Sequence, residues 1–189
     1  MNAFRSAWYR IVVLLMTGLV LASLFSGGLG RPGFAALVIG WTFCLDPVLI
    51  DVVARFMPAR WFRVPEGEHA LHRVFGIPVF ARLIERAGWN DLVVRPLWKE
   101  AGYKPGTKAS LEFRASSART GGGAHAVCFG LHVLLAAAAL VTRHPRAALW
   151  ILLPGVVVHL YPTLLQRSIL LRLQPLLERA PGAAAASPQ

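Results

Sequence analysis

Hydrophobic residues form four long runs, and polar segments of very different length separate them. Each run is long enough to cross a bilayer as a helix, because an α-helix rises about 1.5 Å per residue. The runs lie at about residues 11–30, 33–56, 124–142 and 147–166. This pattern predicts an all-α polytopic membrane protein with four transmembrane helices, in which residues 1–180 form a single integral-membrane domain.

The first run has two interpretations. Arg5 and Arg10 precede it and small residues end it, which is also the arrangement of a secretory signal peptide. The second run begins at residue 33, and only residues 31 and 32 separate it from the first. We therefore predict a retained helix, and cleavage stays open as the alternative.

The long polar segment, residues 57–123, has a helical pattern of its own. Apolar residues recur every three or four positions in residues 70–87, with charged residues between them. This predicts amphipathic helices in the membrane interface, broken near Gly76 and Pro78. Small residues dominate the tail, residues 181–189, which predicts disorder.

Composition and charge support a membrane protein. Hydrophobic residues make up 56% of the chain and charged residues 15%, whereas a soluble domain carries about 25% charged residues. The net charge of +11 would alone suggest a nucleic-acid partner. However, the long polar segment with Arg55 holds 12 of the 20 basic residues, as cytoplasmic loops do. We predict a multi-pass protein of a bacterial-type inner membrane, with cytoplasmic termini, a lipid partner and no nucleic acid.

The two cysteines lie inside hydrophobic runs. Cys44 and Cys128 have no CxxC neighbour, which predicts free thiols. His125, Cys128 and His132 share one helical face, but the stretch is not HExxH and contains no carboxylate. We therefore predict no metal site from this stretch.

The hydrophobic runs also contain polar residues. The predicted topology places several of them at similar depths in the membrane. Residues seven positions apart lie nearly two helical turns apart on one face, so His125 shares a face with His132, and His159 with Gln166. A histidine beside a carboxylate is suited to general-base catalysis, and arginine binds phosphates. The predicted layer near the cytoplasm holds Asp51, His125, Gln166 and Arg167, and the deeper layer holds Asp46, His132 and His159.

Each of these residues also has a structural interpretation. Histidines and carboxylates within spans often only bond to neighbouring helices, and Tyr161 can be an interfacial anchor. Arg167 and Arg172 can hold a helix end at anionic headgroups. The glycine-rich residues 119–125 either bind an anion at a helix N-terminus or form a flexible hinge.

The end of the fourth run resembles a family pattern. Tyr161, Pro162, Gln166, Arg167 and Arg172 match the last span of the glycosyl-4,4'-diaponeurosporenoate acyltransferase family, Asn-x-Tyr-Pro-x-x-x-Gln-Arg-Tyr-Asn-Arg-x-Arg. His159 stands at the Asn position. Ser168, Ile169 and Leu170 replace the Tyr-Asn-Arg core.

Two further stretches carry the resemblance. Arg119 and His125 match a family segment that ends in Ala-Glu-x-x-His, with Gly122 at the glutamate position. A looser match begins at Trp61 and Phe62. It continues through the acidic Glu66 and Glu68 and the aliphatic residues 75–84. The resemblance covers about residues 61–177. Over these residues the chain resembles a divergent member of the family.

The resemblance implies transfer of a fatty acyl group onto a hydroxyl of a glycosylated carotenoid or similar lipid-linked sugar. An acyl thioester such as acyl-CoA would be the co-substrate, with no bound cofactor. His125 would be the base, Gln166 and Tyr161 would position the acceptor or the oxyanion, and His159 would be a polar partner. Arg119 and Arg167 would hold the donor's phosphates. The other implied substrate-binding residues are Arg172, Glu66, Glu68 and Asp51.

Two other functions stay open. One is a non-catalytic membrane scaffold or assembly protein with the same fold. The other is a transporter subunit, which Asp46, Pro47 and the histidines favour, although the sequence lacks the internal repeats typical of transporters.

Overall fold

The computed structural model describes residues 3–58, 62–65, 67–100 and 107–179, and these residues form helices and no strand. Four of the helices are long and apolar enough to cross a membrane. This confirms the all-α prediction and the predicted number of candidate spans. The tail, residues 181–189, lies outside the described residues, so the prediction of disorder there stays untested.

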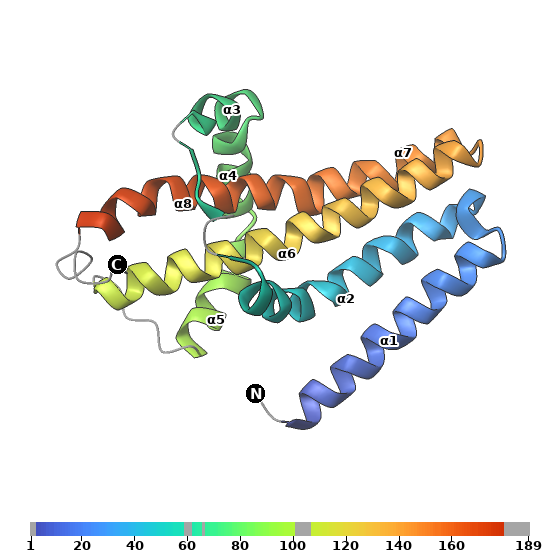
Figure 1. The fold of residues 1–189 in the computed structure, drawn as a ribbon, viewed down its shortest axis with the longest axis horizontal. Coiled ribbons are helices and arrows are strands. Elements are labelled where there is room, and N and C mark those ends of the chain that lie inside the picture. Colours follow the sequence, from blue (N-terminus) through green and yellow to red (C-terminus); the bar gives the residue numbers. More distant parts are fainter. Residues whose placement is uncertain (1–2, 59–61, 66, 101–106, 180–189) are drawn as a thin grey trace. The chain divides into compact units, whose positions relative to one another are not determined.

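Figure 1 shows the helices in their order along the chain. Two five-residue segments, η3 and η4, are π-helical, and η1 is a 3-10 turn. In chain order the elements are α1 (Ala3–Phe25), η1 (Gly28–Gly30), α2 (Pro32–Phe56), α3 (Glu68–Val74), α4 (Ile77–Arg86), η3 (Asn90–Val94), α5 (Arg95–Glu100), α6 (Lys108–Val141), α7 (Pro145–Gly155), η4 (Val156–Leu160) and α8 (Tyr161–Arg179).

The first helix ends before the predicted limit of its hydrophobic run. Gly27 has φ 72°, a left-handed conformation that glycine adopts without steric cost and that commonly ends helices. The 3-10 turn η1 then leads into α2. Pro47 lies inside α2 without ending it.

The third candidate span begins well before the predicted start near Ala124. Helix α6 starts at Lys108, where the Thr107 hydroxyl accepts the Ser110 N–H at 3.1 Å and so caps the helix. The glycine-rich residues 119–125 therefore lie inside a continuous helix. The interpretation as an anion site at a helix N-terminus is therefore wrong, and the flexible hinge stays a prediction.

The fourth candidate span is one long helical segment made of α7, η4 and α8. Pro154 lies in α7 and lacks the N–H that an α-helix needs, and the π turn η4 follows directly. Single π turns inside helices are frequent at functional sites. Helix α8 continues to Arg179, well beyond the predicted end at Gln166.

The chain divides into two compact units, which are described separately. Unit 1 contains residues 1–56 and 123–162. Its core draws side chains from α1, α2, α6 and α7, and the Trp41 indole donates to the Thr17 hydroxyl at 2.9 Å to join α2 to α1. The buried core residues are Val20, Leu29, Phe34, Val38, Ala136, Ala139, Ala148 and Ile151.

Unit 2 contains residues 57–122 and 163–189. It includes α3 and α4, which overlap residues 70–87 where the sequence pattern predicted helices, and α5 further along the long polar segment. Its small core joins the first part of α6 to α8 and to the segment that precedes α3. The buried core residues are Val64, Ala115, Ala118, Leu170 and Leu173.

Gly155 sets the distance between two helices of unit 1. A Cβ atom at Gly155 would lie 2.6 Å from Cγ and 2.7 Å from Cβ of His132, closer than such atoms can approach. These two atoms are the first of the histidine side chain, so rotation of the side chain cannot relieve the contact. Gly155 thus allows α6 and α7 to pack closely enough for His132 to lie between them.

We predict that Gly155→Ala destabilises the protein by about 1–3 kcal/mol, the usual cost of an overpacked core. Thermal unfolding in detergent micelles measures the effect. Gly130→Ala on α6 is the matched control, since nothing lies within 4 Å of its added methyl group. The control should be neutral or gain up to about 1 kcal/mol from helix propensity. Equal stability of the two variants would contradict the close packing.

Candidate functional site

Six polar side chains meet inside unit 1. They come from α2, α6 and the π turn η4, and they lie among apolar core residues. Thr42, His132 and His159 are at most 1% exposed, so each of their polar atoms needs a partner within the protein. The six residues, called here the polar cluster, are Thr42, Asp46, His125, Cys128, His132 and His159.

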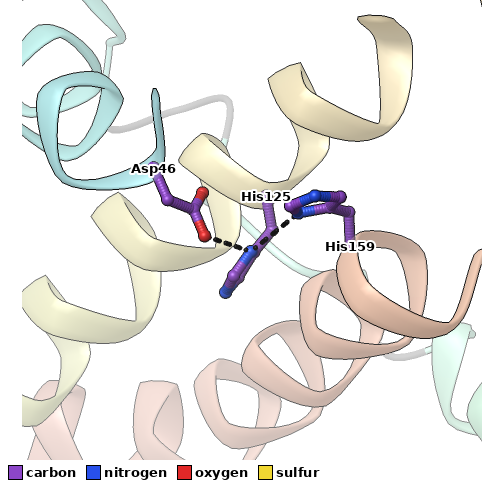
Figure 2. Close-up of side chains that lie close together, drawn as sticks. All are labelled: Asp46, His125 and His159. Atoms are coloured by element: carbon purple, nitrogen blue, oxygen red, sulfur yellow. Dashed lines mark hydrogen bonds and ion pairs between the residues drawn. The ribbon is translucent and has the colours of Figure 1, made fainter. Parts of the chain in front are cut away.

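The centre of the polar cluster is a contact between a histidine and a carboxylate. His125 Nδ1 lies 2.9 Å from Asp46 Oδ2, and the two side chains are 24% and 15% exposed. Figure 2 shows the second ring nitrogen of His125 pointing away from both Asp46 and His159. An Nδ1–H that donates to Asp46 leaves a lone pair on the Nε2 of a neutral His125.

A second histidine reaches the same nitrogen. His159 Nδ1 lies 3.3 Å from His125 Nδ1 (Figure 2). Asp46, His125 and His159 each offer one ligand atom, and these three atoms lie within 4.8 Å of one another. The arrangement therefore suits either a shared proton or a shared cation.

Hydrogen bonds fix the proton on His159. The His132 Nδ1 lies 2.7 Å from the Ile151 carbonyl, which only accepts, so Nδ1–H donates and the Nε2 of a neutral ring accepts. The Thr42 hydroxyl lies 3.2 Å from that Nε2, 3.0 Å from His159 Nε2 and 3.0 Å from the Ile39 carbonyl, and its one proton goes to Ile39 or to His132. In either case the hydroxyl oxygen accepts from His159 Nε2, because His159 Nδ1 faces the Nδ1–H of His125. His159 consequently carries its proton on Nε2 and directs the Nδ1 lone pair at His125.

Cys128 holds the other carboxylate oxygen. Its thiol lies 3.6 Å from Asp46 Oδ1 and 3.6 Å from the Thr42 carbonyl. Both cysteines are free, as predicted. His125 and Cys128, on successive turns of α6, thus contact the two oxygens of the Asp46 carboxylate.

The structure confirms part of the predicted layering. Asp46, His132 and His159 belong to one connected network, and His125 and His132 share a face of α6. His125, however, contacts this deeper group, whereas the prediction placed it with Asp51, Gln166 and Arg167. Asp51 is exposed, and Tyr161 is half-buried.

Sequence reasoning missed Thr42, which joins two of the histidines. Thr42 lies four residues before Asp46, so that both occupy one face of α2. This spacing was the available signal. A lone threonine in an apolar helix usually bonds to its own backbone, as Thr42 also does to the Ile39 carbonyl at 3.0 Å, and so it did not stand out.

In unit 2, two predicted substrate-binding residues pair with each other. Arg167 Nε on α8 donates to Glu68 Oε2 on α3 at 2.9 Å, and Arg167 Nη2 contacts Glu68 Oε1. A bidentate guanidinium–carboxylate pair is among the strong charge-assisted contacts. It ties α3 to α8.

Gln166 packs against the glycine-rich part of α6 within unit 2. A Cβ atom at Gly122 would lie 3.0 Å from Gln166 Cβ, and the Thr163 hydroxyl donates to the Gly122 carbonyl at 3.4 Å. The glutamate of the family pattern at this position would therefore push Gln166 away. Any side chain at Gly122 would need Gln166 to shift by a few tenths of an ångström.

Arg119 is half-buried and Arg172 is exposed. Glu66 lies outside the described residues, as does Trp61.

Comparison with protein-family models, with curated proteins and with solved structures found no match. The fold defines an all-helical chain with four candidate membrane spans. Its function is therefore argued from the polar cluster.

Thr42→Val tests the hydrogen-bond assignment. Valine has the shape of threonine but leaves the buried Nε2 atoms of His132 and His159 without their partner, at about 1–3 kcal/mol for each group. Thermal unfolding in detergent should show the loss. Thr142→Val is the control, because the exposed Thr142 hydroxyl bonds only to its own helix. A loss no greater than in the control would contradict the assignment.

His72 in α3 should titrate below its ordinary range. Its side chain is 5% exposed, and burial lowers its pKa from 6.5, although Glu68 at 3.7 Å raises it in part. Since the folded protein disfavours the charged ring, stability from this residue is present above pH 6.5 and is lost as the pH falls. NMR titration of histidine-labelled protein, assigned with His72→Gln, measures this pKa. A value at or above 6.5 would mean that Glu68 dominates.

Proposed function

We propose that this chain is a membrane-bound acyltransferase in which His125, oriented by Asp46, activates a hydroxyl group. The observation that carries the proposal is the contact between His125 Nδ1 and Asp46 Oδ2 at 2.9 Å on a partly exposed histidine. A carboxylate that accepts from Nδ1–H fixes the tautomer in which Nε2 is the base. This pairing is the usual way in which a protein prepares a histidine to take a hydroxyl proton.

The proposed reaction moves an acyl group from sulfur to oxygen. The acceptor hydroxyl loses its proton to His125 Nε2, and its oxygen attacks the thioester carbonyl. The new C–O bond forms and the C–S bond breaks. The proton then passes from His125 to the leaving thiolate, so that His125 returns to its starting state. Asp46 would stabilise the transient imidazolium.

The acceptor should be lipid-soluble. The base lies within helices long and apolar enough to cross a membrane, so a hydroxyl carried by a lipid can reach it from the bilayer. The resemblance favours a sugar hydroxyl on a glycosylated carotenoid, with acyl-CoA or a similar thioester as donor. We further propose that the long polar segment is cytoplasmic and that α3 to α5 lie at the interface.

Roles for the residues of unit 2 rest on the resemblance alone. Gln166, Arg119 and Arg172 would contact the substrates. We assign Arg167 instead to joining α3 and α8, because its guanidinium is paired with Glu68.

A non-catalytic scaffold is the second candidate function. The observation that favours it is the closed hydrogen-bond chain from Ile151 through His132 and Thr42 to His159, which would serve a purely structural core equally well. Under this alternative the polar cluster specifies helix packing and nothing else.

His125→Ala should abolish acylated product in lipid and pigment extracts of expressing cells, and Asp46→Asn should lower it roughly 10²–10⁴-fold, as loss of general-base catalysis does. His144→Ala is the control, because His144 is exposed. Protein levels and thermal stability are measured in parallel.

The scaffold predicts a different set of outcomes. Well-folded His125→Ala and Asp46→Asn variants would then keep the cellular phenotype, while Gly155→Ala would lose it through misfolding. Unchanged acylated product from stable His125→Ala protein would remove His125 from the mechanism.

A further inference from the structure

Three potential metal ligands from three helical elements converge in unit 1. Asp46 comes from α2, His125 from α6 and His159 from η4, and their ligand atoms lie within 4.8 Å of one another (Figure 2). We propose that Asp46, His125 and His159 bind one divalent transition-metal ion of the zinc class. Binding of the ion is independent of acyl transfer, whereas its catalytic role, given below, rests on the proposed function.

The spacing of the ligand atoms fits such an ion. Two ligands about 2.0–2.1 Å from a tetrahedral zinc ion are about 3.3 Å from each other. The two histidine Nδ1 atoms are 3.3 Å apart, and His125 Nδ1 and Asp46 Oδ2 are 2.9 Å apart. Shifts of a few tenths of an ångström would therefore suffice for coordination by these pairs.

The proton on His159 is already placed for metal binding. Its Nε2–H donates to Thr42, and Nδ1 presents a lone pair to the cluster. Metal-bound histidines almost always donate the other ring N–H to a fixed polar partner, which orients the ring. Thr42 has this role here, and the Ile39 carbonyl and His132 in turn orient the Thr42 hydroxyl.

His125 needs one rearrangement. To bind through Nδ1 it must carry its proton on Nε2, which is the other neutral tautomer of the ring. The metal-bound and metal-free forms therefore differ in which nitrogen of His125 is protonated. The ring needs no large movement, because Nδ1 already points between Asp46 and His159 (Figure 2).

The charge of Asp46 favours a cation. A carboxylate within a membrane span is costly unless an opposite charge compensates it. Among the described residues, Asp46 forms an ion pair with a histidine but with no lysine or arginine. A divalent ion would supply the missing positive charge, and the Cys128 thiol would hold the other carboxylate oxygen.

The donor set selects the kind of ion. Two imidazoles and one carboxylate suit zinc and similar first-row metals, whereas magnesium and calcium need mostly oxygen ligands. Three protein ligands leave a fourth position for water or a substrate. Under the proposed function, the ion would bind the acceptor hydroxyl there and lower its pKa, in place of His125 as a base.

Metal binding is tested on the full chain, purified in detergent without a histidine tag and stripped with a chelator. Isothermal titration with Zn²⁺ should give one site per chain, and Co²⁺ should give the visible absorption of a four-coordinate ion. Mg²⁺ and Ca²⁺ should not compete. Absence of a one-to-one Zn²⁺ site in the folded wild type would overturn the proposal.

Variants assign the site to these residues. Asp46→Asn, His125→Gln and His159→Gln should abolish tight binding, and Thr42→Val should weaken it roughly 10–100-fold, as loss of an orienting partner does. His144→Gln should bind as the wild type does. Wild-type affinity in folded His125→Gln or His159→Gln would place the metal elsewhere and refute the site.

Activity separates the two proposals. Zinc binding without any acyl transfer would refute the proposed function and leave the site standing. Acyl transfer that persists at the full rate in metal-free protein would refute the catalytic role of the ion and favour His125 as the base. Loss of activity on stripping, with recovery on adding Zn²⁺, would support the metal site and acyl transfer together, and would make the ion rather than His125 Nε2 the group that activates the hydroxyl.

Discussion

The cost of placing a carboxylate inside an apolar helix governs the structure of unit 1. Asp46 lies in a candidate span, and a charge there persists only if neighbouring groups stabilise it. His125 and Cys128 contact its two oxygens, and His159 reaches the same histidine nitrogen. Three helical elements must therefore come together around one side chain. The apolar core positions these elements, and the carboxylate decides which polar residues face inward.

Small residues make that convergence possible. Gly155 leaves the space that the His132 ring occupies, and the π turn that follows carries His159. Helices in membranes pack through small residues and interhelical hydrogen bonds, because lipid offers little hydrophobic drive for association. Gly155, the π turn and the hydrogen bonds of the histidines thus act together to pack these helices. In unit 2, Gly122 has the corresponding role beneath Gln166.

The sequence predicted the spans well and their ends poorly. Hydrophobic runs define spans because lipid requires them, but the ends depend on local features such as the Thr107 cap and the left-handed Gly27. The error at α6 also affected the site. Depths counted from assumed helix ends placed His125 in a different layer from Asp46. The seven-residue spacing of His125 and His132, which needs no end point, was a sound guide to their common face.

The partners of each polar residue could not be derived from the sequence, since they depend on how helices rotate against one another. Thr42 shows this most clearly. On its own helix it is an ordinary threonine, yet between two imidazoles it fixes the tautomer of His159. In that tautomer the Nδ1 lone pair of His159 lies beside His125 and Asp46. The polar cluster can therefore accept a proton or a cation at this point. A proton on His125 Nδ1 makes the pair a base, and its transfer to Nε2 opens the same three atoms to a cation.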